Sequence, residues 1–324
     1  MFPDQTNGPA GHEPEMVVIG GGTGLATLLR GLKRFTSRLT AVVTVADDGG
    51  SSGRLRREMD IQPPGDIRNC LAALSEDESL LARLFQYRFE DGPLSGHSFG
   101  NLFLAALTKV TGDFEEAVRL SSTILATRGR VLPATPETVS LRAQLDDGQQ
   151  VNGQSAIAGS RQSCRRVWLD PQGARATAAA LEAIRAADIV VLGPGSLFTS
   201  IIPNLLIKDI AGAIGETAGR KVFVCNVMTQ PGETLEFTAA DHLAALLAHS
   251  REGLVDTILV NDVSPPEDVV KLYLATGAGP VMVDERRLRQ MGVEVVAADV
   301  CSAGDFFRHD SDRLAAAIMA LIKQ

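Results

Sequence analysis

Residues 16–25 read MVVIGGGTGL, a short β-branched run that leads directly into a glycine cluster. Leucines then follow at helical spacing as far as Leu32, so the segment predicts a strand, a tight loop and a helix. A second apolar run, 39–45, ends in ADDGG at 46–50 and completes the beginning of a βαβ unit. Because successive strands of such units are parallel, the sequence predicts an α/β protein with a mostly parallel sheet.

The rest of the chain continues this pattern after one interruption. Beyond Gly53 the apolar spacing predicts helices, and Asp146-Asp147-Gly148 is typical of a hairpin turn. This interrupting segment should contain helices 67–74, 80–85, 101–110 and 114–125 and strands 139–145 and 167–169. After it we expect helices 176–187, 239–248 and 313–322 and strands 189–192, 222–225, 257–260, 281–283 and 293–296. We expect a Rossmann-like sheet with helices on both faces, one domain over 16–324, and a helical and β-hairpin insertion at about 54–170.

Composition and charge disfavour several classes of protein. The 324 residues are 45% hydrophobic and 22% charged, as in ordinary globular proteins, and the net charge is −8. This acidic balance disfavours nucleic acid and anionic membrane surfaces as partners. Residues 1–15 lack the apolar core of a signal peptide and predict a flexible tail, and no run of about 18 apolar residues predicts a membrane span. We expect a cytoplasmic protein whose separated cysteines are reduced.

The first glycine loop is a candidate ligand site. It consists of Gly20, Gly21, Gly22, Thr23 and Gly24. Glycines at a strand-to-helix junction let the backbone approach a phosphate, whose charge is favoured by the amino end of the helix. The loop lacks the third glycine of GxGxxG and the lysine of a Walker loop. Phosphate binding and a merely tight turn are both compatible with this motif.

Two aspartates follow the second expected strand. Asp47 and Asp48 lie where ligands of open α/β sheets collect, and they suit Mg²⁺, a ribose hydroxyl or a proton as partner. Asp-Asp-Gly-Gly is equally typical of a solvated turn.

A second glycine loop, LGPGS, ends the strand 189–192. Gly193, Gly195 and Ser196 could grip a diphosphate from the side opposite the first loop, although Ser196 also suits a plain helix cap. Asn226 ends the next strand and offers a donor and an acceptor to a substrate, while its neighbourhood also fits a Pro-Gly turn.

Polar groups also precede two helices of the expected insertion. The motifs PPGDIRN and GHSFGN contain Asp66 and Ser98 as candidate helix caps. Beside them stand Arg68, Asn69, His97 and Asn101. Such groups are costly to bury without partners, so we expect them to face a cleft at the sheet. For His97 a structural and a catalytic role are equally open.

Six ordered blocks together resemble a known family. They are VVIGGGTGL, VTVADDGGSSGRLR, PPGDIRNCLAAL, GHSFGNLFLAAL, LGPGSLFTSIIPNLL and VCNVMTQPGET. They look like the gluconeogenesis factor family, which is similar to the 2-phospho-L-lactate transferases of deazaflavin cofactor synthesis. The likeness extends over nearly all of residues 16–324, and six blocks in order are far more specific than one glycine loop.

The resemblance implies a CofD-like fold with a nucleotide site. In the transferases a guanosine diphosphate moiety lies there, and a phospholactyl group moves to a deazaflavin hydroxyl with Mg²⁺. Gluconeogenesis factors are instead regulatory proteins that bind UDP-sugars such as UDP-N-acetylglucosamine and support cell-wall synthesis and cell shape on gluconeogenic carbon. Tyr273 in YLATGAGPV and Arg308 in RHDS match the family positions implicated in the UDP-sugar site.

Chemistry agrees with these two roles, because a tyrosine ring can cover uracil and an arginine can pair with diphosphate oxygens. Without the resemblance, the spacing favours core-edge packing for Tyr273 and a solvated helix cap for Arg308. Relatives are phosphorylated by Ser/Thr kinases in this segment, so Ser311 is a candidate phosphorylation site, although it also suits an N-cap. The family further suggests a homodimer.

Three functions follow as hypotheses. The leading one is a UDP-sugar-binding regulator, to which the sequence assigns no definite cofactor while leaving Mg²⁺ open. The alternative is a phospholactyl or phospho-group transferase in which Asp47 and Asp48 act with Mg²⁺, Asp47 being the metal ligand. The second alternative is an NAD(P)-binding oxidoreductase with Asp47 on a ribose hydroxyl, which the missing third glycine disfavours.

Overall fold

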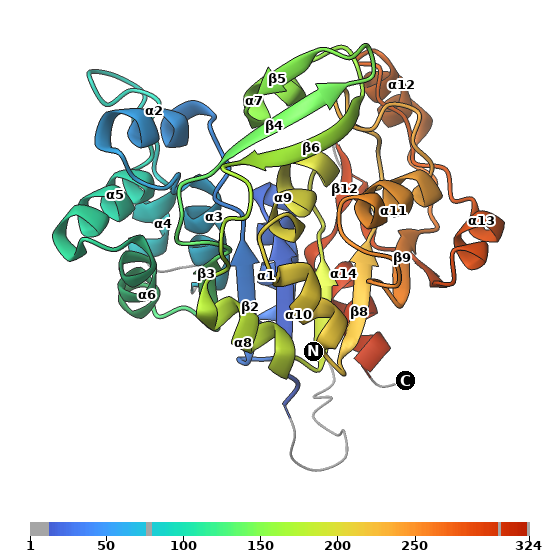
Figure 1. Ribbon diagram of the computed structural model, residues 1–324, viewed down its shortest axis with the longest axis horizontal. Coiled ribbons are helices and arrows are strands. Elements are labelled where there is room, and N and C mark those ends of the chain that lie inside the picture. The colour runs from blue at the N-terminus through green and yellow to red at the C-terminus, as the bar shows by residue number, and fades with distance from the viewer. Residues whose placement is uncertain (1–12, 76–79, 304–305, 323–324) are drawn as a thin grey trace.

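A central seven-stranded parallel sheet organises the computed structural model, which describes residues 13–75, 80–303 and 306–322 (Figure 1). In spatial order its strands are β10 (Glu294–Ala298), β9 (Thr257–Asn261), β8 (Arg220–Val224), β7 (Ile189–Leu192), β1 (Met16–Gly20), β2 (Leu39–Val43) and β3 (Arg130–Pro133). Strands β1, β2 and β7 are buried along their whole length, as expected for a sheet covered on both faces.

The strand order reverses next to β1. This strand pairs in parallel with β2 on one side and with β7 on the other. In the sequence, about 145 residues lie between β2 and β7. In open α/β sheets such a reversal leaves a crevice at the carboxyl ends of the strands, where ligands bind. The loops that follow β1 and β7 therefore start side by side at that crevice.

Helices cover both faces of the sheet. They are α1 (Gly22–Leu32), α2 (Gly50–Met59), α3 (Gly65–Leu74), α4 (Leu80–Gln86), α5 (Phe99–Thr111), α6 (Phe114–Ile124), α7 (Gln154–Ala158), α8 (Ala178–Ala186), a π-helix η1 (Leu197–Ile201), α9 (Ile202–Leu205), α10 (Ile210–Glu216), α11 (Ala239–Ala248), α12 (Glu267–Leu274), α13 (Glu285–Gln290) and α14 (Ser311–Ile322). Helix α1 packs against α3 and α14, while α8 and α10 pack together in front of the sheet in Figure 1. No helix in the described ranges is both long and apolar enough to cross a membrane.

Two small antiparallel sheets complete the fold. Strands β4 (Ser140–Leu145), β5 (Gln150–Asn152) and β6 (Cys164–Asp170) form one, which lies at the top of Figure 1, and β11 (Cys301–Ala303) and β12 (Phe307–His309) form the other. The expected Asp146-Asp147-Gly148 turn connects β4 to β5, so the predicted hairpin is part of a three-stranded sheet.

The α/β, Rossmann-like, mostly parallel fold predicted from the sequence is confirmed, but individual elements differ, and α7, β11 and β12 were not predicted. The expected strand 281–283 is wrong: the only pairing nearby is the Met228–Pro280 bridge, and Met282 is 72% exposed. Strand β3 was not predicted, because four residues ending in proline carry little periodic signal at a sheet edge. It lies inside the range 54–170 but belongs to the central sheet. Of the expected tail, residues 1–12 lie outside the described residues.

Candidate functional site

A cavity of about 300 Å³ opens at the carboxyl ends of β1, β7 and β8. Its walls come from the first glycine loop and the start of α1, the second glycine loop, the segment 226–230, α12 and strand β12. The structure brings together nine residues that the sequence singled out, namely Gly21, Gly22, Thr23, Gly24, Gly195, Ser196, Asn226, Tyr273 and Arg308. Gly20 ends β1 and Gly193 follows β7, with a Cβ built on Gly20 lying 3.8 Å from Gly193 Cα.

The first loop brings the amino end of a helix to the edge of this cavity. Helix α1 begins at Gly22, whose φ of +68° is a left-handed conformation that favours glycine, and its N-cap residue Gly21 has no side chain to accept a bond. The first turn contains no acidic residue. One donor is occupied, because the Asp66 carboxyl accepts from the Gly22 N–H. The N–H groups of Thr23 and Gly24 are left at the positive end of the helix dipole, which favours an anion.

The two glycine loops pack directly against each other. A Cβ added to Gly24 would lie 2.8 Å from the Pro194 carbonyl oxygen, and one added to Gly195 would lie 3.2 Å from the Gly21 carbonyl oxygen. Side chains larger than hydrogen would therefore push the loops apart. Glycine is needed at these positions because the two backbones approach closely, and this explains its presence better than a need for flexible loops does.

The second loop is held in place by a buried carboxylate. Glu233 is 3% exposed, and it accepts from the Phe198 N–H at 2.9 Å and from the Thr199 hydroxyl at 2.7 Å. Burial raises the pKa of Glu233, although these hydrogen bonds oppose the shift. Ser196, expected as a possible cap of this helix, makes no cap hydrogen bond. The role of the cap at η1 is thus taken by Glu233, and Ser196 is left to face the cavity.

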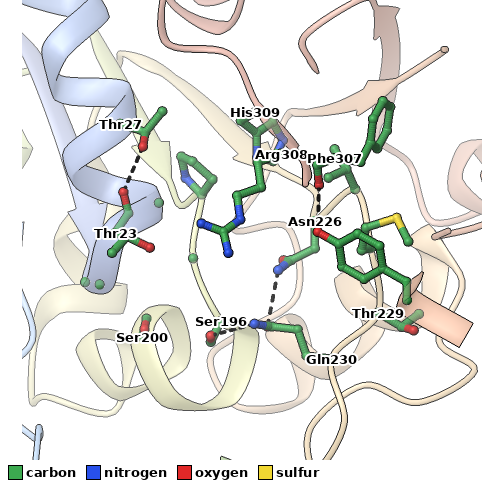
Figure 2. Close-up of a pocket in the computed structure, with 18 residues that line it drawn as sticks. Thr23, Thr27, Ser196, Ser200, Asn226, Thr229, Gln230, Phe307, Arg308 and His309 are labelled. Carbon is green, nitrogen blue, oxygen red and sulfur yellow. Dashed lines mark hydrogen bonds between the residues drawn. The ribbon is translucent and has the colours of Figure 1, made fainter. Parts of the chain in front are cut away.

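Ser196 is linked to Asn226 by Gln230. The Gln230 amide donates to the Ser196 hydroxyl at 3.0 Å, and the Asn226 amide lies 3.4 Å from the Gln230 side-chain oxygen. Figure 2 shows this chain of three side chains along one wall of the cavity. Gln230 and Glu233 both belong to the block VCNVMTQPGET. For this part of the block the sequence suggested a Pro-Gly turn and gave no role to either side chain.

Arg308 supplies the charge of the cavity. Its side chain extends from β12 into the space between Thr23 and the wall formed by Ser196 and Asn226 (Figure 2). No aspartate or glutamate is among the described residues that line the cavity. The guanidinium also lies 4.6 Å from the centre of the exposed Phe306 ring. An exposed guanidinium in a cavity without carboxylates favours an anionic ligand.

Tyr273 forms part of the adjoining wall. It is half-buried on α12, and its hydroxyl donates to the Phe307 carbonyl at 3.3 Å. His309 follows Arg308 in the same strand, and burial lowers the pKa of His309 to about 4, so the ring is neutral.

Neither Asp47 nor Asp48 is among the described residues that line the cavity. Asp47 accepts from the Gly49 N–H at 2.9 Å, and Asp48 accepts from the N–H and the hydroxyl of Ser155 on α7, both at 3.0 Å. Asp66, for which the sequence suggested a helix cap, comes closest to the loop: a Cβ on Gly21 would lie 2.7 Å from its oxygen. The described residues contain no cluster of three or more potential metal ligands.

The remaining polar candidates, Arg68, Asn69, His97 and Asn101, lie on or next to helices α3 and α5. His97 Nδ1 lies 2.9 Å from the Ser51 hydroxyl, to which the Asn101 amide donates at 3.1 Å. Arg68 donates to Asn69 at 2.7 Å. None of these residues lines the cavity. Ser98 caps α5 as expected, accepting from Asn101 N–H at 3.2 Å.

Ser311 begins α14, but Asp310 accepts from the first-turn N–H groups and is the cap. The half-buried Ser311 hydroxyl donates to the Thr27 carbonyl on α1 at 2.9 Å. A kinase would have to break this contact to reach the hydroxyl.

Asp66 should make stability depend on pH. Burial and the neighbouring Asp47 raise its pKa from 3.8 to about 7. Between these values the unfolded chain loses the proton while the folded chain keeps it, so the free energy of unfolding falls as pH rises through this window and levels off above 7. We expect Asp66→Asn, which keeps an acceptor for Gly22, to remove this component, worth roughly 4 kcal/mol at most. Urea unfolding of both proteins from pH 4 to 8 measures this component. If the free energy of unfolding changed with pH equally in the two proteins, the expectation would be contradicted.

Comparisons with known proteins agree with this architecture. The model of the family described as "2-phospho-L-lactate transferase CofD" matches residues 16–301. The chain is 49% identical to the gluconeogenesis factor of Bacillus subtilis over 97% of this chain and 100% of that protein. It is 51% identical to the gluconeogenesis factor of Halalkalibacterium halodurans over 94% of this chain and 95% of that one.

A solved structure is equally similar. The crystal structure of protein BH3568 from Bacillus halodurans matches with a TM-score of 0.92 and 49% identity, over 95% of this chain and 100% of that one. Identity of this level over the full length of the relatives leaves the family in no doubt. The chain belongs to the gluconeogenesis factors, a branch of the CofD-like family.

Proposed function

We propose that the protein is a regulator that binds a UDP-sugar, UDP-N-acetylglucosamine in the first instance, and that it thereby supports cell-wall synthesis and cell shape during growth on gluconeogenic carbon. The observation that carries this proposal is the cavity at the switch point of the sheet. It combines the uncapped amino end of helix α1, one arginine and an aromatic wall, with no carboxylate among its described lining residues. A nucleoside diphosphate offers the matching parts: two phosphates and a flat base.

Each part of the ligand has a counterpart in the cavity. The diphosphate would lie between the amino end of α1 and Arg308, with the hydroxyl of Thr23 on one side of the cavity and that of Ser196 on another. The base would lie against Tyr273 on α12. A calorimetric titration with UDP-N-acetylglucosamine, GDP and NAD ranks the ligands. Micromolar binding of the UDP-sugar supports the proposal, and binding of NAD alone would refute it.

Tyr273 tests the base contact. Replacing it by alanine should weaken UDP-sugar binding about tenfold, because base–aromatic stacking contributes about 1–3 kcal/mol. Tyr273→Phe keeps the ring and loses only the hydrogen bond to the Phe307 carbonyl, so it should bind nearly as the original protein does. Calorimetry with inorganic pyrophosphate, which has no base, should give the same affinity for all three proteins. A loss of pyrophosphate binding in the alanine variant would mean a general structural effect instead.

A second candidate is a Mg²⁺-dependent transferase, favoured by the description of the matching family and by the paired carboxyls of Asp47 and Asp66 behind the first loop. Mg²⁺ is commonly held by one or two carboxylates together with substrate phosphates. Asp48 fits this role less well, because its carboxylate already accepts from Ser155. Incubation with UDP-N-acetylglucosamine and Mg²⁺, followed by chromatography, tests for turnover. Steady release of UDP or UMP would establish an enzyme.

A further inference from the structure

A second, smaller cavity adjoins the first at the ends of β8 and β9. Its volume is about 140 Å³, and it shares Asn226, Val227 and Phe307 with the larger cavity. Asn261, Asp262 and Ser264 provide its remaining polar side chains. The two cavities therefore adjoin across these three residues, and together we call them the bipartite space, with the glycine loops and Arg308 at one end and the segment 260–265 at the other.

Three hydrogen-bond acceptors without partners among the described residues lie around this junction. The side-chain oxygens of Asn226 and Asn261 and Nε2 of His309 are buried, and none accepts a hydrogen bond from a described residue. All three residues line one or both cavities. Buried polar atoms nearly always have partners, and leaving one unpaired costs about 1–3 kcal/mol. Three such atoms around one space indicate that a ligand supplies donors there.

The orientation of two of these acceptors is fixed by their other contacts. The Asn261 amide nitrogen donates to the Val263 carbonyl at 2.6 Å, so its oxygen must be the unpaired atom. The His309 ring forms a hydrogen bond with the Cys225 backbone, and because Nε2 has no partner among the described residues, Nδ1 makes this bond. A neutral ring that donates from one nitrogen presents the other, Nε2, as an acceptor. Asn226 is oriented by the Gln230 side chain.

The bipartite space thus has a donor end and an acceptor end. We propose, on the basis of the function proposed above, that the acceptor end holds the nucleoside part of the ligand, and that Asn261, Asn226 and His309 accept hydrogen bonds from its ribose hydroxyls or its base N–H. The position is suitable because Phe307, whose carbonyl accepts from Tyr273, lies at the junction of the two cavities. A base against Tyr273 would bring the nucleoside next to these acceptors.

Titration of the intact chain with four probes tests this assignment. UDP is compared with 2′-deoxy-UDP, which lacks a ribose donor, with CDP, in which N3 is an acceptor instead of a donor, and with inorganic pyrophosphate. We expect at least one of the two analogues to bind about tenfold more weakly than UDP, because a donor to a buried acceptor is lost. The weaker analogue identifies the source of the donor, ribose or base.

Asn261→Leu keeps the size of the side chain and removes its acceptor. This variant should bind UDP about tenfold more weakly and should bind pyrophosphate as the unmodified protein does. The difference in affinity between UDP and the weaker of the two analogues should become smaller. Ser122→Ala is a matched control, since it removes another buried unpaired oxygen on α6, outside both cavities, and should alter none of the affinities. Equal binding of UDP, 2′-deoxy-UDP and CDP to the unmodified protein would overturn the inference even if the variant does not fold. Failure of UDP and pyrophosphate alike to bind would overturn the proposed function as well.

Discussion

Replacing Arg308 by alanine should weaken the binding of UDP-N-acetylglucosamine about a hundredfold, the largest effect that we expect of any single side chain in the cavity. Charge-assisted hydrogen bonds to phosphate contribute about 1.5–3 kcal/mol each, and a guanidinium can make two in parallel. No second lysine or arginine is among the described lining residues, so nothing nearby replaces the lost charge. Isothermal titration calorimetry at fixed ionic strength measures the change.

Two matched variants separate the causes. Arg308→Lys keeps the charge but loses the planar pair of donors, and should recover only part of the affinity. Arg286→Ala removes another exposed positive charge, on α13 and outside the cavity, and should have little effect. If Arg286→Ala weakens binding as much as Arg308→Ala, the net charge of the protein matters and the cavity is not the site.

The sequence could predict the core of the fold because the relevant signals are local. A β-branched run that ends in a glycine cluster predicts where a buried strand ends and a helix begins, as at β1 and β7. That the two glycine loops lie together follows from strand order, since carboxyl ends of neighbouring parallel strands meet at one edge. Their mutual contact, Gly24 against Pro194, depends on atomic packing that no periodicity contains.

Side chains that act through the backbone were harder to predict. Asp66 and Glu233 are isolated carboxylates in the sequence, and their importance comes from burial against the N–H groups of α1 and η1. Asp47 and Asp48 had the stronger motif, yet neither lines the cavity, and their carboxylates accept from Gly49 and Ser155. Tyr273 and Arg308 had no local signal beyond the family resemblance, since long-range folding alone brings α12 and β12 to the glycine loops.

Gly24→Ala should lower both stability and affinity through a single added methyl group. The new Cβ would lie 2.8 Å from the Pro194 carbonyl oxygen and 3.2 Å from the Gly195 nitrogen, and backbone atoms cannot rotate away. The φ angle of Gly24 is not in the left-handed region, so alanine suits the helix itself and the cost comes from the contact between the loops. Overpacking of this kind costs about 1–3 kcal/mol. We expect urea unfolding to show that loss, and calorimetry to show at least about tenfold weaker UDP binding, since a displaced loop misplaces the phosphate donors.

Gly212→Ala is the appropriate comparison, because it adds the same methyl group to a helical glycine of α10 with no atom within 4 Å of the new carbon. That variant should gain up to about 1 kcal/mol from helix propensity and bind UDP unchanged. The opposite signs of the two alanine substitutions would locate the cost of Gly24→Ala in the contact between the loops. If Gly24→Ala were instead as stable as Gly212→Ala and bound UDP equally well, the two loops would not be packed together in solution, and a diphosphate could not be held by both.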